Sequence, residues 1–370
     1  MTTEAGFLRI YVYGASEGES IALHFPNNAW GVVDSLASSP RDPGTNPVHR
    51  LLKDKKVSEI EFLCITHPHA DHFMGMTQFF RDFRVKQFWT FFGLEPTDFK
   101  LLRTYFLAEA AQANRARLKE AAQELTSIFD AAESSGIEPQ LVMSLRRLHP
   151  VPRDDALRFE VWGIAPTDKS VRRYKRNLLN SFTRNPVAVQ ALPHAKHNEI
   201  SIGLRINFGK TMILLGGDVE EEGWQEVLKQ HGQDELAAHF VKVSHHGSST
   251  GYCSGLWPAL CGKTKRKPIA ALTPYKRFGL PDPEALDHIS QYVEAVYSAS
   301  TTGHAKRTED WRIKAIGKLK AAQTGRIQGR SSAPGCCEIE ANDQGDCRVI
   351  LHSPACTLFR AKVSEQEGGS

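Results

Sequence analysis

The chain has 370 residues, of which 46 are lysine or arginine and 42 are aspartate or glutamate, so the formal net charge is +4. Hydrophobic residues make up 41% of the chain and charged residues 24%, which excludes wholesale disorder and fibrous repeats. A charge so close to neutral does not favour a nucleic-acid coat protein or a polybasic membrane binder. The length predicts either about two domains or one large α/β domain with an insertion.

We expect a cytoplasmic protein that does not insert into a membrane. No apolar run approaches the roughly 18–20 residues that span a bilayer, and residues 1–13 lack the features of a signal peptide. Seven cysteines, an odd number in a long chain, predict reduced thiols. The C-terminal part carries no C-x-x-C pair, so a metal knuckle there is the minor alternative; it would use Cys336, Cys337, Cys347 and Cys356.

Short strands and helices alternate through the first quarter of the chain. Runs dominated by apolar side chains predict strands, and amphipathic segments predict helices. We expect strands at 7–13, 21–25, 30–34, 60–65 and 85–90, and helices at 49–56 and 74–83. Residues 35–46, rich in Ser, Pro, Asp and Gly, predict a loop.

Between residues 96 and 135 the pattern changes to apolar residues at three- and four-residue steps among charged ones. This spacing predicts a long amphipathic helical region, and it is carried by Leu102, Phe106, Ala110, Ala113, Leu118, Ala121, Leu125 and Phe129. We interpret the region as a cover whose apolar stripe joins the core. The alternative is a substrate cap or an arm that contacts a second copy or a partner protein.

The remaining chain returns to alternating strands and helices, which is typical of an α/β protein. Residues 169–184 form a basic loop or helix, and residues 281–297 predict a loop followed by a helix. The other predicted elements are strands at 157–164, 240–244 and 269–272, a hairpin of 200–208 and 211–215, a helix at 220–230, and edge strands at 348–352 and 357–361.

The strongest chemical signal is the run T-H-P-H-A-D-H at residues 66–72, directly after an apolar strand. Imidazole nitrogen and carboxylate oxygen suit zinc, manganese or iron. Because His67 and His69 are two residues apart, they can face one metal ion, and Asp71 and His72 can then face a second.

Two later segments repeat this arrangement of an apolar strand followed by candidate ligands. One strand runs into Asp218 through a pair of glycines, and another runs into His245 and His246. The carboxyl ends of strands are where an α/β sheet places its site. A carboxylate between two cations can bridge them, so the pattern predicts a two-metal centre.

These motifs together resemble the metallo-β-lactamase-fold superfamily, and in particular the soluble hydrolase domain of ComEC-type DNA-uptake proteins and its stand-alone relatives. Besides the H-x-H-x-D-H run, the resemblance rests on G-A-S-E-G-E-S at 14–20, V-V-D-S at 32–35, N-x-x-S at 198–201, K-V-S-H-H-G-S at 242–248, and the segment 275–286. It covers about residues 5–95 and 156–300.

The resemblance implies an αββα sandwich with two divalent ions, Zn²⁺ or Mn²⁺, at one edge of the paired sheets, and hydrolysis by a metal-bound hydroxide. It implies a hydrolase domain over residues 1–325, with a helical insertion at about 96–150. Residues 326–370 would be a C-terminal extension, partly packed on the domain.

By position, the resemblance assigns His67 and His69 to one metal ion, Asp71 and His72 to the other, and Asp218 to both. A histidine of the pair at 245–246 completes the second site. We favour His246 as that ligand and His245 as a phosphate-binding or proton-donating group, so the expected catalytic residues are Asp71 and His245.

The sequence departs from the superfamily pattern at some positions. Where many members carry a third histidine for the first site, this chain has H-N-E at 197–199. Asn198 matches the ComEC-type relatives, and His197 and His194 remain candidate ligands or site-lining residues. Glu19 stands where the relatives have aspartate, which puts a shared substrate in doubt.

Phosphodiester hydrolysis is the favoured reaction, because two metal ions suit in-line attack on phosphorus. The substrate would carry phosphate, as nucleic acid or a nucleotide does. Candidate phosphate- or substrate-binding residues are Arg172, Arg173, Lys175, Arg176, Ser248 and Tyr275. One alternative is a lactone, thioester or β-lactam hydrolase with an apolar acyl pocket formed by Trp89, Phe91, Phe92 and the helical insertion. The other is a non-catalytic metal-binding module.

Overall fold

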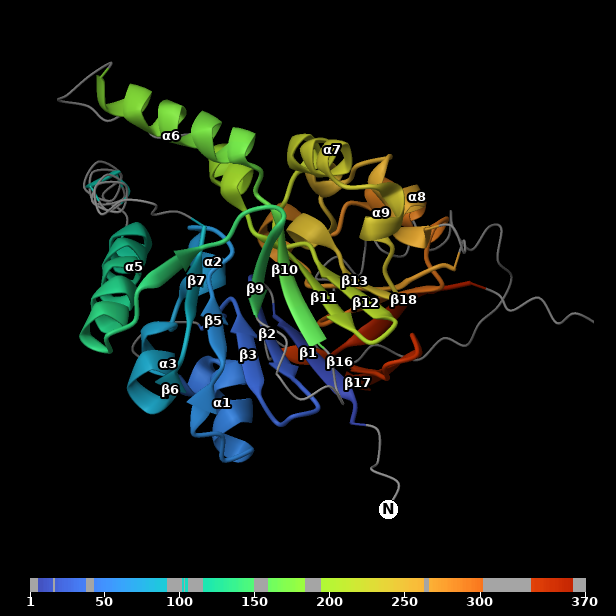
Figure 1. The fold of residues 1–370 in the computed structure, drawn as a ribbon, viewed down its shortest axis with the longest axis horizontal. Coiled ribbons are helices and arrows are strands. Elements are labelled where there is room, and N and C mark those ends of the chain that lie inside the picture. Colours follow the sequence, from blue (N-terminus) through green and yellow to red (C-terminus); the bar gives the residue numbers. More distant parts are fainter. Residues whose placement is uncertain are drawn as a thin grey trace, which may run out of the picture.

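The computed structural model describes residues 6–15, 17–37, 43–91, 102, 104–105, 116–149, 159–183, 194–262, 266–301 and 334–361. Two eight-stranded sheets form the centre of this part of the chain, with helices on either side of the pair (Figure 1). The predicted αββα sandwich is confirmed.

The first sheet combines an antiparallel half with a parallel half. Strands β17, β16, β1, β2 and β3 pair antiparallel, and β3, β5, β7 and β8 pair parallel. In spatial order the strands are β17 (Cys347–His352), β16 (Gly335–Ala341), β1 (Leu8–Gly14), β2 (Glu19–His24), β3 (Trp30–Val33), β5 (Phe62–Cys64), β7 (Phe88–Thr90) and β8 (Pro139–Leu141). A separate parallel pair joins β4 (Glu59–Ile60) to β6 (Arg84–Val85).

The second sheet is parallel in its middle and antiparallel at both ends. Strands β12 to β15 run parallel, while β9 to β12 and the pair β15–β18 are antiparallel. Its order is β18 (Cys356–Arg360), β15 (Ala295–Ser298), β14 (Ile269–Leu272), β13 (Phe240–Lys242), β12 (Thr211–Leu215), β11 (Gly203–Phe208), β10 (Phe159–Ala165) and β9 (Arg146–His149).

The helices fall into two groups, one for each sheet. Side chains of α1 (Pro47–Asp54), α3 (Thr77–Asp82) and α5 (Ala116–Ser134) join the core of the first sheet. Those of α7 (Glu221–Gln230), α8 (Leu256–Cys261) and α9 (Pro283–Ser290) join the core outside the second sheet. The short α2 (Ala70–Phe73) follows β5, and α6 (Asp168–Thr183) extends away from the body of the molecule (Figure 1). Among the described residues, no helix has the length and apolarity needed to cross a bilayer.

Residues of the central strands are buried on both faces of the second sheet. Ile213 and Leu215 pack into the core between the sheets, whereas Leu214 packs under the outer helices. In the same way, Phe240 packs into the core between the sheets and Val241 packs under the outer helices. Because successive strand residues point to opposite faces, a strand covered on both sides reads as a continuous apolar run. This explains why the sequence pattern locates these strands.

Two segments differ from the predicted elements. Residues 295–298 form strand β15 rather than the end of a helix. Residues 139–149, inside the region expected to be a helical insertion, form β8 and β9 after helix α5, and each is an edge strand of a different sheet. An edge strand is buried on fewer sides, so a polar segment such as R-R-L-H in β9 gives little strand signal. Of the helical region predicted at 96–135, residues 116–134 form α5, whereas residues 96–101, 103 and 106–115 lie outside the described residues, with Phe106, Ala110 and Ala113 among them.

The described part of the C-terminal extension supplies strands to both sheets. Strand β16 pairs along the whole of β1, and β18 pairs with β15. The edge strands predicted at 348–352 and 357–361 are confirmed as β17 and β18. The four C-terminal cysteines lie in β16, β17 and β18. Within the part of the chain that the structure describes, no cluster of potential metal ligands contains a cysteine.

Candidate metal centre

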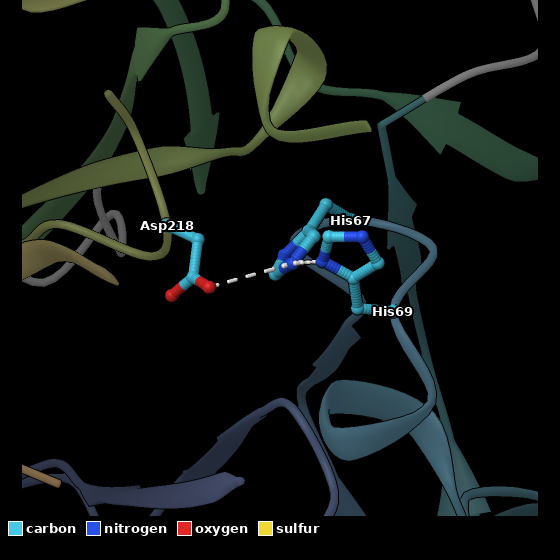
Figure 2. Close-up of side chains that lie close together, drawn as sticks. All are labelled: His67, His69 and Asp218. Atoms are coloured by element: carbon cyan, nitrogen blue, oxygen red, sulfur yellow. Dashed lines mark hydrogen bonds and ion pairs between the residues drawn. The ribbon is translucent and has the colours of Figure 1, made fainter. Parts of the chain in front are cut away.

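Three turns at one edge of the two sheets bring the predicted ligands together. The turn after β5 carries residues 66–72, the turn after β12 carries Asp218, and the turn after β13 carries His245 and His246. Figure 2 shows Asp218, from the second sheet, facing His67 and His69, from the first. The site therefore lies where the carboxyl ends of strands from both sheets meet.

Two groups of side chains in this cluster could each hold a metal ion. One group is His67, His69 and Asp218, and the other is Asp71, His72 and His246; within each group the ligand atoms lie within 4.8 Å of one another. The Oδ2 atom of Asp218 lies 3.6 Å from Nε2 of His67, 3.5 Å from Nε2 of His72 and 3.7 Å from Nε2 of His246. One carboxylate is thus shared by both groups.

The chemistry of the buried atoms fits divalent ions. Nε2 of His72, Nε2 of His246 and Oδ1 of Asp218 are buried and have no hydrogen-bond partner among the described residues. Buried polar atoms are normally satisfied, so three such atoms in one cluster indicate a ligand that they would bind. Imidazole and carboxylate donors are those that Zn²⁺ and Mn²⁺ accept.

The adjacent residues His245 and His246 occupy different environments. The His246 side chain is 2% exposed, and its Nε2 lies 3.6 Å from Oδ2 of Asp71. The His245 side chain is 22% exposed, and its Nε2 lies 4.0 Å from Oδ2 of Asp218. Both residues have a positive φ, 47° and 55°, a costly conformation for side chains of this size. This left-handed turn separates the two rings, and it is His246 that joins the potential ligands.

Electrostatic interactions keep both carboxylates of the centre ionised. Burial raises the pKa of Asp218, but His72 and His246 outweigh it and hold that pKa well below its usual value. For Asp71, burial again raises the pKa, and the same two histidines lower it well below the ordinary range. A cluster with two ionised carboxylates is one that attracts cations.

Asp34 and Thr66 form a buried support beneath the histidines of the first sheet. The Asp34 carboxylate accepts hydrogen bonds from the backbone N–H of Thr66 (2.8 Å), its hydroxyl (2.7 Å) and Nδ1 of His72 (2.7 Å). Since the Thr66 hydroxyl donates to Asp34, it accepts from Nδ1 of His67 at 3.0 Å. In both histidines these contacts hold a proton on Nδ1, so Nε2 is the nitrogen that faces the site, and in His72 it can bind a metal ion once it has lost its own proton.

Histidine pKa values in the centre move in opposite directions. Burial lowers the pKa of His72, but Asp218, Asp71 and Asp34 together raise it well above the ordinary value. Burial lowers the pKa of His67 well below the ordinary value, and the neighbouring His72 lowers it further. His67 is therefore neutral at neutral pH, as a ligand must be.

His197 and Asn198 both border the centre, although they are adjacent in sequence. They lie in a 3-10 segment, His194–Ile200, rather than in a strand. Nδ1 of His197 lies 2.8 Å from the Tyr174 hydroxyl, and its ring centroid is 5.5 Å from that of His69. Because the segment is not extended, neighbouring side chains are not forced to opposite faces. The side chain of His194 lies outside the described residues.

Asn198 belongs to a hydrogen-bonded group around His245. Its Nδ2 lies 3.4 Å from Nε2 of His245 and donates to Oε1 of Glu220 at 3.2 Å. On the other side of the ring, Nδ1 of His245 lies 3.0 Å from the Thr250 hydroxyl and 3.4 Å from Oε1 of Glu220. The hydroxyl of Ser248 caps the turn that carries Thr250. Glu220 and Thr250 were not singled out in the sequence, where nothing places them beside His245.

The basic run at residues 172–176 lies on helix α6. Its second arginine, Arg173, is already paired with acidic side chains. Arg173 forms ion pairs with Glu199 (3.2 Å), Glu222 (2.7 Å) and Glu226 (3.0 Å). The expectation that Arg173 is free to bind phosphate is not supported, because the helix turns it toward acidic groups of the 3-10 segment and of α7. Arg172 pairs with Asp168.

The other substrate-binding candidates lie in different settings. Lys175 is half-buried and Arg176 exposed on α6, and the Tyr275 ring lies 5.1 Å from the ring of His246.

Trp89 and Phe91, considered for an acyl pocket, are fully buried in the core, where Trp89 stacks on Phe62 with centroids 3.9 Å apart. Phe92 lies outside the described residues.

The fold and the site together define an αββα protein with a candidate two-metal centre at one edge of its sheets. No protein-family model matches the sequence. Among curated proteins it is similar to the uncharacterized protein YcaI of Escherichia coli (strain K12), with 26% identity over 125 residues. That match spans 33% of this chain and 16% of YcaI.

Among solved structures, the fold is similar to a mutant of the CmlA β-hydroxylase, with a TM-score of 0.37 and 13% identity over 87% of this chain and 52% of that one. It is also similar to Zn²⁺-bound PqqB from Methylobacterium extorquens, with a TM-score of 0.31 and 12% identity over 63% of this chain and 71% of PqqB. Likenesses this distant do not assign an activity.

Proposed function

We propose that the protein is a metal-dependent hydrolase with two divalent ions, Zn²⁺ or Mn²⁺, that cleaves phosphodiesters of nucleic acid or of a nucleotide. The observation that carries the proposal is the position of Asp218, whose Oδ2 lies 3.5–3.7 Å from Nε2 of three histidines. In this proposal Asp218 contributes to both sites. The first site is completed by His67 and His69, and the second by Asp71, His72 and His246.

The chain's own residues prepare the centre for two ions. Asp34 and Thr66 orient the Nε2 atoms of His67 and His72 toward the site, and the ionised Asp71 and Asp218 balance the cationic charge. When bound, two ions activate water as a nucleophile and stabilise charge on the attacking and leaving oxygens. This chemistry suits attack on a phosphodiester.

His245 is the group we propose to donate a proton to the leaving oxygen. Its ring is held from one side by Thr250 and Glu220 and lies near Asn198 on the other. Its partly exposed Nε2 edge is 4.0 Å from Asp218, so it borders the centre without joining either ligand group. A general acid needs this reach toward the reacting atoms. Arg176 on α6 remains a candidate for binding phosphate.

The placement of the aromatic residues favours a phosphodiester over an acyl substrate. An acyl substrate would call for an apolar pocket beside the metal ions. Trp89 and Phe91, two of the residues considered for one, are fully buried in the core and do not line a pocket. Phe92 and part of the helical insertion, which were also considered, lie outside the described residues. The burial of Trp89 and Phe91 supports the phosphodiesterase proposal against the lactone, thioester and β-lactam alternatives.

The proposal is tested by loading the protein with Zn²⁺ or Mn²⁺ and measuring turnover of bis-p-nitrophenyl phosphate beside a panel of lactones. We expect turnover of the phosphodiester and none of the lactones. His69→Ala and Asp71→Ala should abolish it, whereas His352→Ala, an exposed histidine on β17, should not. A protein with two ions bound and no phosphodiesterase activity would contradict the reaction. Activity that survives either ligand substitution would contradict the site.

A further inference from the structure

Besides Asp34, a second buried carboxylate supports the candidate centre. It lies on the Nδ1 side of His246, and it belongs to the first sheet, whereas His246 follows a strand of the second. Glu19, at the start of β2 in the first sheet, is 0% exposed. Its Oε2 accepts a hydrogen bond from the Thr273 hydroxyl at 2.9 Å and forms an ion pair with Nζ of Lys242. Thr273 and Lys242 both belong to the second sheet. The Thr273 hydroxyl in turn lies 2.9 Å from Nδ1 of His246.

The direction of these hydrogen bonds determines which nitrogen of His246 carries the proton. The Thr273 hydroxyl has one hydrogen, which it donates to Glu19, so toward His246 it accepts. The backbone carbonyl of Thr273, which can only accept, lies 3.1 Å from the same Nδ1. Both contacts require the proton on Nδ1. The Nε2 lone pair then faces Asp71 and Asp218, in the position of a metal ligand.

Lys242 links the same carboxylate to the turn that carries Asp218. Its side chain is 0% exposed, and Nζ lies 3.5 Å from the carbonyl oxygen of Gly217, the residue before Asp218. A buried ion pair is a weak source of stability, because desolvation offsets the attraction. A buried lysine that contacts both Glu19 and this turn is therefore better explained by a role in the site.

We propose that Glu19, Thr273 and Lys242 are positioning residues that hold His246 in its metal-binding tautomer and orientation, and that they do so across the interface between the two sheets. The proposal rests on the proposed metal centre but not on the proposed phosphodiesterase activity. It is the counterpart, on the second sheet, of the support that Asp34 and Thr66 provide on the first. Its residues touch no substrate and act through His246.

The deciding experiment compares Thr273→Val, which removes the hydroxyl and keeps the shape, with Thr273→Ser, which keeps the hydroxyl. Affinity for each ion is measured by competition between the protein and a chelator for Zn²⁺, and ligand geometry by the visible absorption of the Co²⁺-loaded protein. Thr273→Val should weaken binding of the second ion about tenfold, as loss of a support to a ligand histidine does, and change the Co²⁺ spectrum. Thr273→Ser should bind like the wild type.

Thr126→Val, which removes a hydroxyl on α5 that donates to the carbonyl oxygen of Ala122, is the matched control and should change neither affinity nor spectrum. Unchanged binding and spectrum in Thr273→Val would overturn the proposal. So would an equal loss in Thr273→Ser, since packing rather than the hydroxyl would then be responsible. If Thr273→Val does not fold, ¹⁵N NMR of the metal-free wild type decides: the proton on Nδ1 of His246 is expected, and a proton on Nε2 overturns the proposal.

Glu19→Gln separates positioning from direct ligation. Oε1 of Glu19 has no hydrogen-bond partner among the described residues, and Glu19 groups with Asp218 and His246 as a further set of potential ligands. A positioning role predicts that the variant still binds two ions at saturation, with weaker affinity. Loss of one ion at saturation would make Glu19 a ligand and overturn the proposal. A wild type that binds both ions without hydrolysing phosphodiesters would contradict only the proposed activity.

Discussion

The candidate metal centre has a fully buried floor and a partly exposed rim, and different kinds of side chains form the two. The floor consists of Glu19, Asp34, Thr66, Lys242 and Thr273, each no more than 1% exposed. Floor carboxylates and hydroxyls contact the Nδ1 atoms of the candidate ligand histidines His67, His72 and His246. Contacts of this kind fix ring orientation and tautomer before any ion arrives.

The rim consists of Asn198, Glu220, His245 and Thr250, which form hydrogen bonds and an ion pair around the single ring of His245. Asn198 is buried, His245 is partly exposed and Thr250 is exposed. From this difference we expect that the floor affects how tightly ions bind and that the rim affects turnover of a substrate. Four substitutions test this division, in order of decreasing expected effect.

Asp218→Asn should have the largest effect, because Asp218 lies between floor and rim and contacts both groups of potential ligands. Asparagine replaces the shared carboxylate by a neutral amide with one oxygen, a weaker ligand for two ions, so turnover should fall at least about 10³-fold. Turnover and bound metal are measured together. Asp287→Asn, at an exposed position on α9, is the control, and a similar fall in both variants would refute the special role of Asp218.

Asp34→Ala tests the floor through stability. It leaves the Thr66 N–H and the raised-pKa imidazole of His72 buried without their acceptor, which should lower the free energy of unfolding of the metal-free protein by about 3–5 kcal/mol. Urea unfolding in the presence of a chelator measures this. Asp34→Asn should lose less, because asparagine tolerates the positive φ of 60° at this position and keeps an acceptor oxygen. If Asp34→Ala unfolds at the same urea concentration as the wild type, Asp34 does not contribute this free energy of unfolding.

His245→Ala tests the rim through turnover. If His245 donates a proton to the leaving oxygen, kcat should fall about 10²-fold, the lower end for a general acid, while two ions remain bound. His246→Ala is the matched comparison and should lose an ion. Loss of an ion from His245→Ala with His246→Ala unaffected would reverse the roles assigned to these neighbours.

Glu226 on α7 tests the contact between α7 and α6. It pairs with Arg173, which also pairs with Glu199, the residue after Asn198 of the rim. Burial raises the pKa of Glu226, but the hydroxyls of Thr167 and Ser170, with Lys169 and Arg173, lower it to about 2. The folded pKa is below the unfolded value of about 4.3, so the unfolded state binds more protons between them. This contribution is at most about 3 kcal/mol, and solvent screening makes it smaller. It is fully present only above the unfolded pKa of about 4.3, and it is lost as the pH falls through the folded pKa of about 2.

The free energy of unfolding at about pH 6 and about pH 3, measured for the wild type and Glu226→Gln, checks this contribution. The wild type should lose more stability on acidification than the variant. Equal losses in both proteins would show that another carboxylate carries the acid sensitivity. The hydrogen-bond and ion-pair partners of Glu226 are Thr167, Ser170, Lys169 and Arg173, none of them a floor residue. The variant should therefore keep wild-type affinity for both ions, which separates the two regions again.

Much of the fold and the positions of the candidate ligands could be predicted from the sequence because the informative patterns are local. Four candidate ligands fall between His67 and His72, directly after an apolar strand. Asp218 and His246 are far from that run, but each follows a strand of the parallel centre of the second sheet, where both faces are buried and the apolar run is continuous. Strands of this kind converge at one sheet edge.

The supports of the site could not be predicted in the same way. Glu19 and Thr273 are separated by 254 positions, and no periodicity connects a strand start in one sheet with a strand end in the other. Arg173 illustrates the opposite error: in sequence it belongs to a basic run, whereas the helix directs it to three glutamates. A charge in a run is informative only once its neighbours in space are known.

The central claim is that both sheets supply ligands to two ions that share Asp218. The most direct measurement is the number of Zn²⁺ or Mn²⁺ ions bound per chain at saturation, determined for the wild type and for His246→Ala. The account predicts two ions in the wild type and one in the variant. A single ion in the wild type, or two ions in the variant, would contradict it.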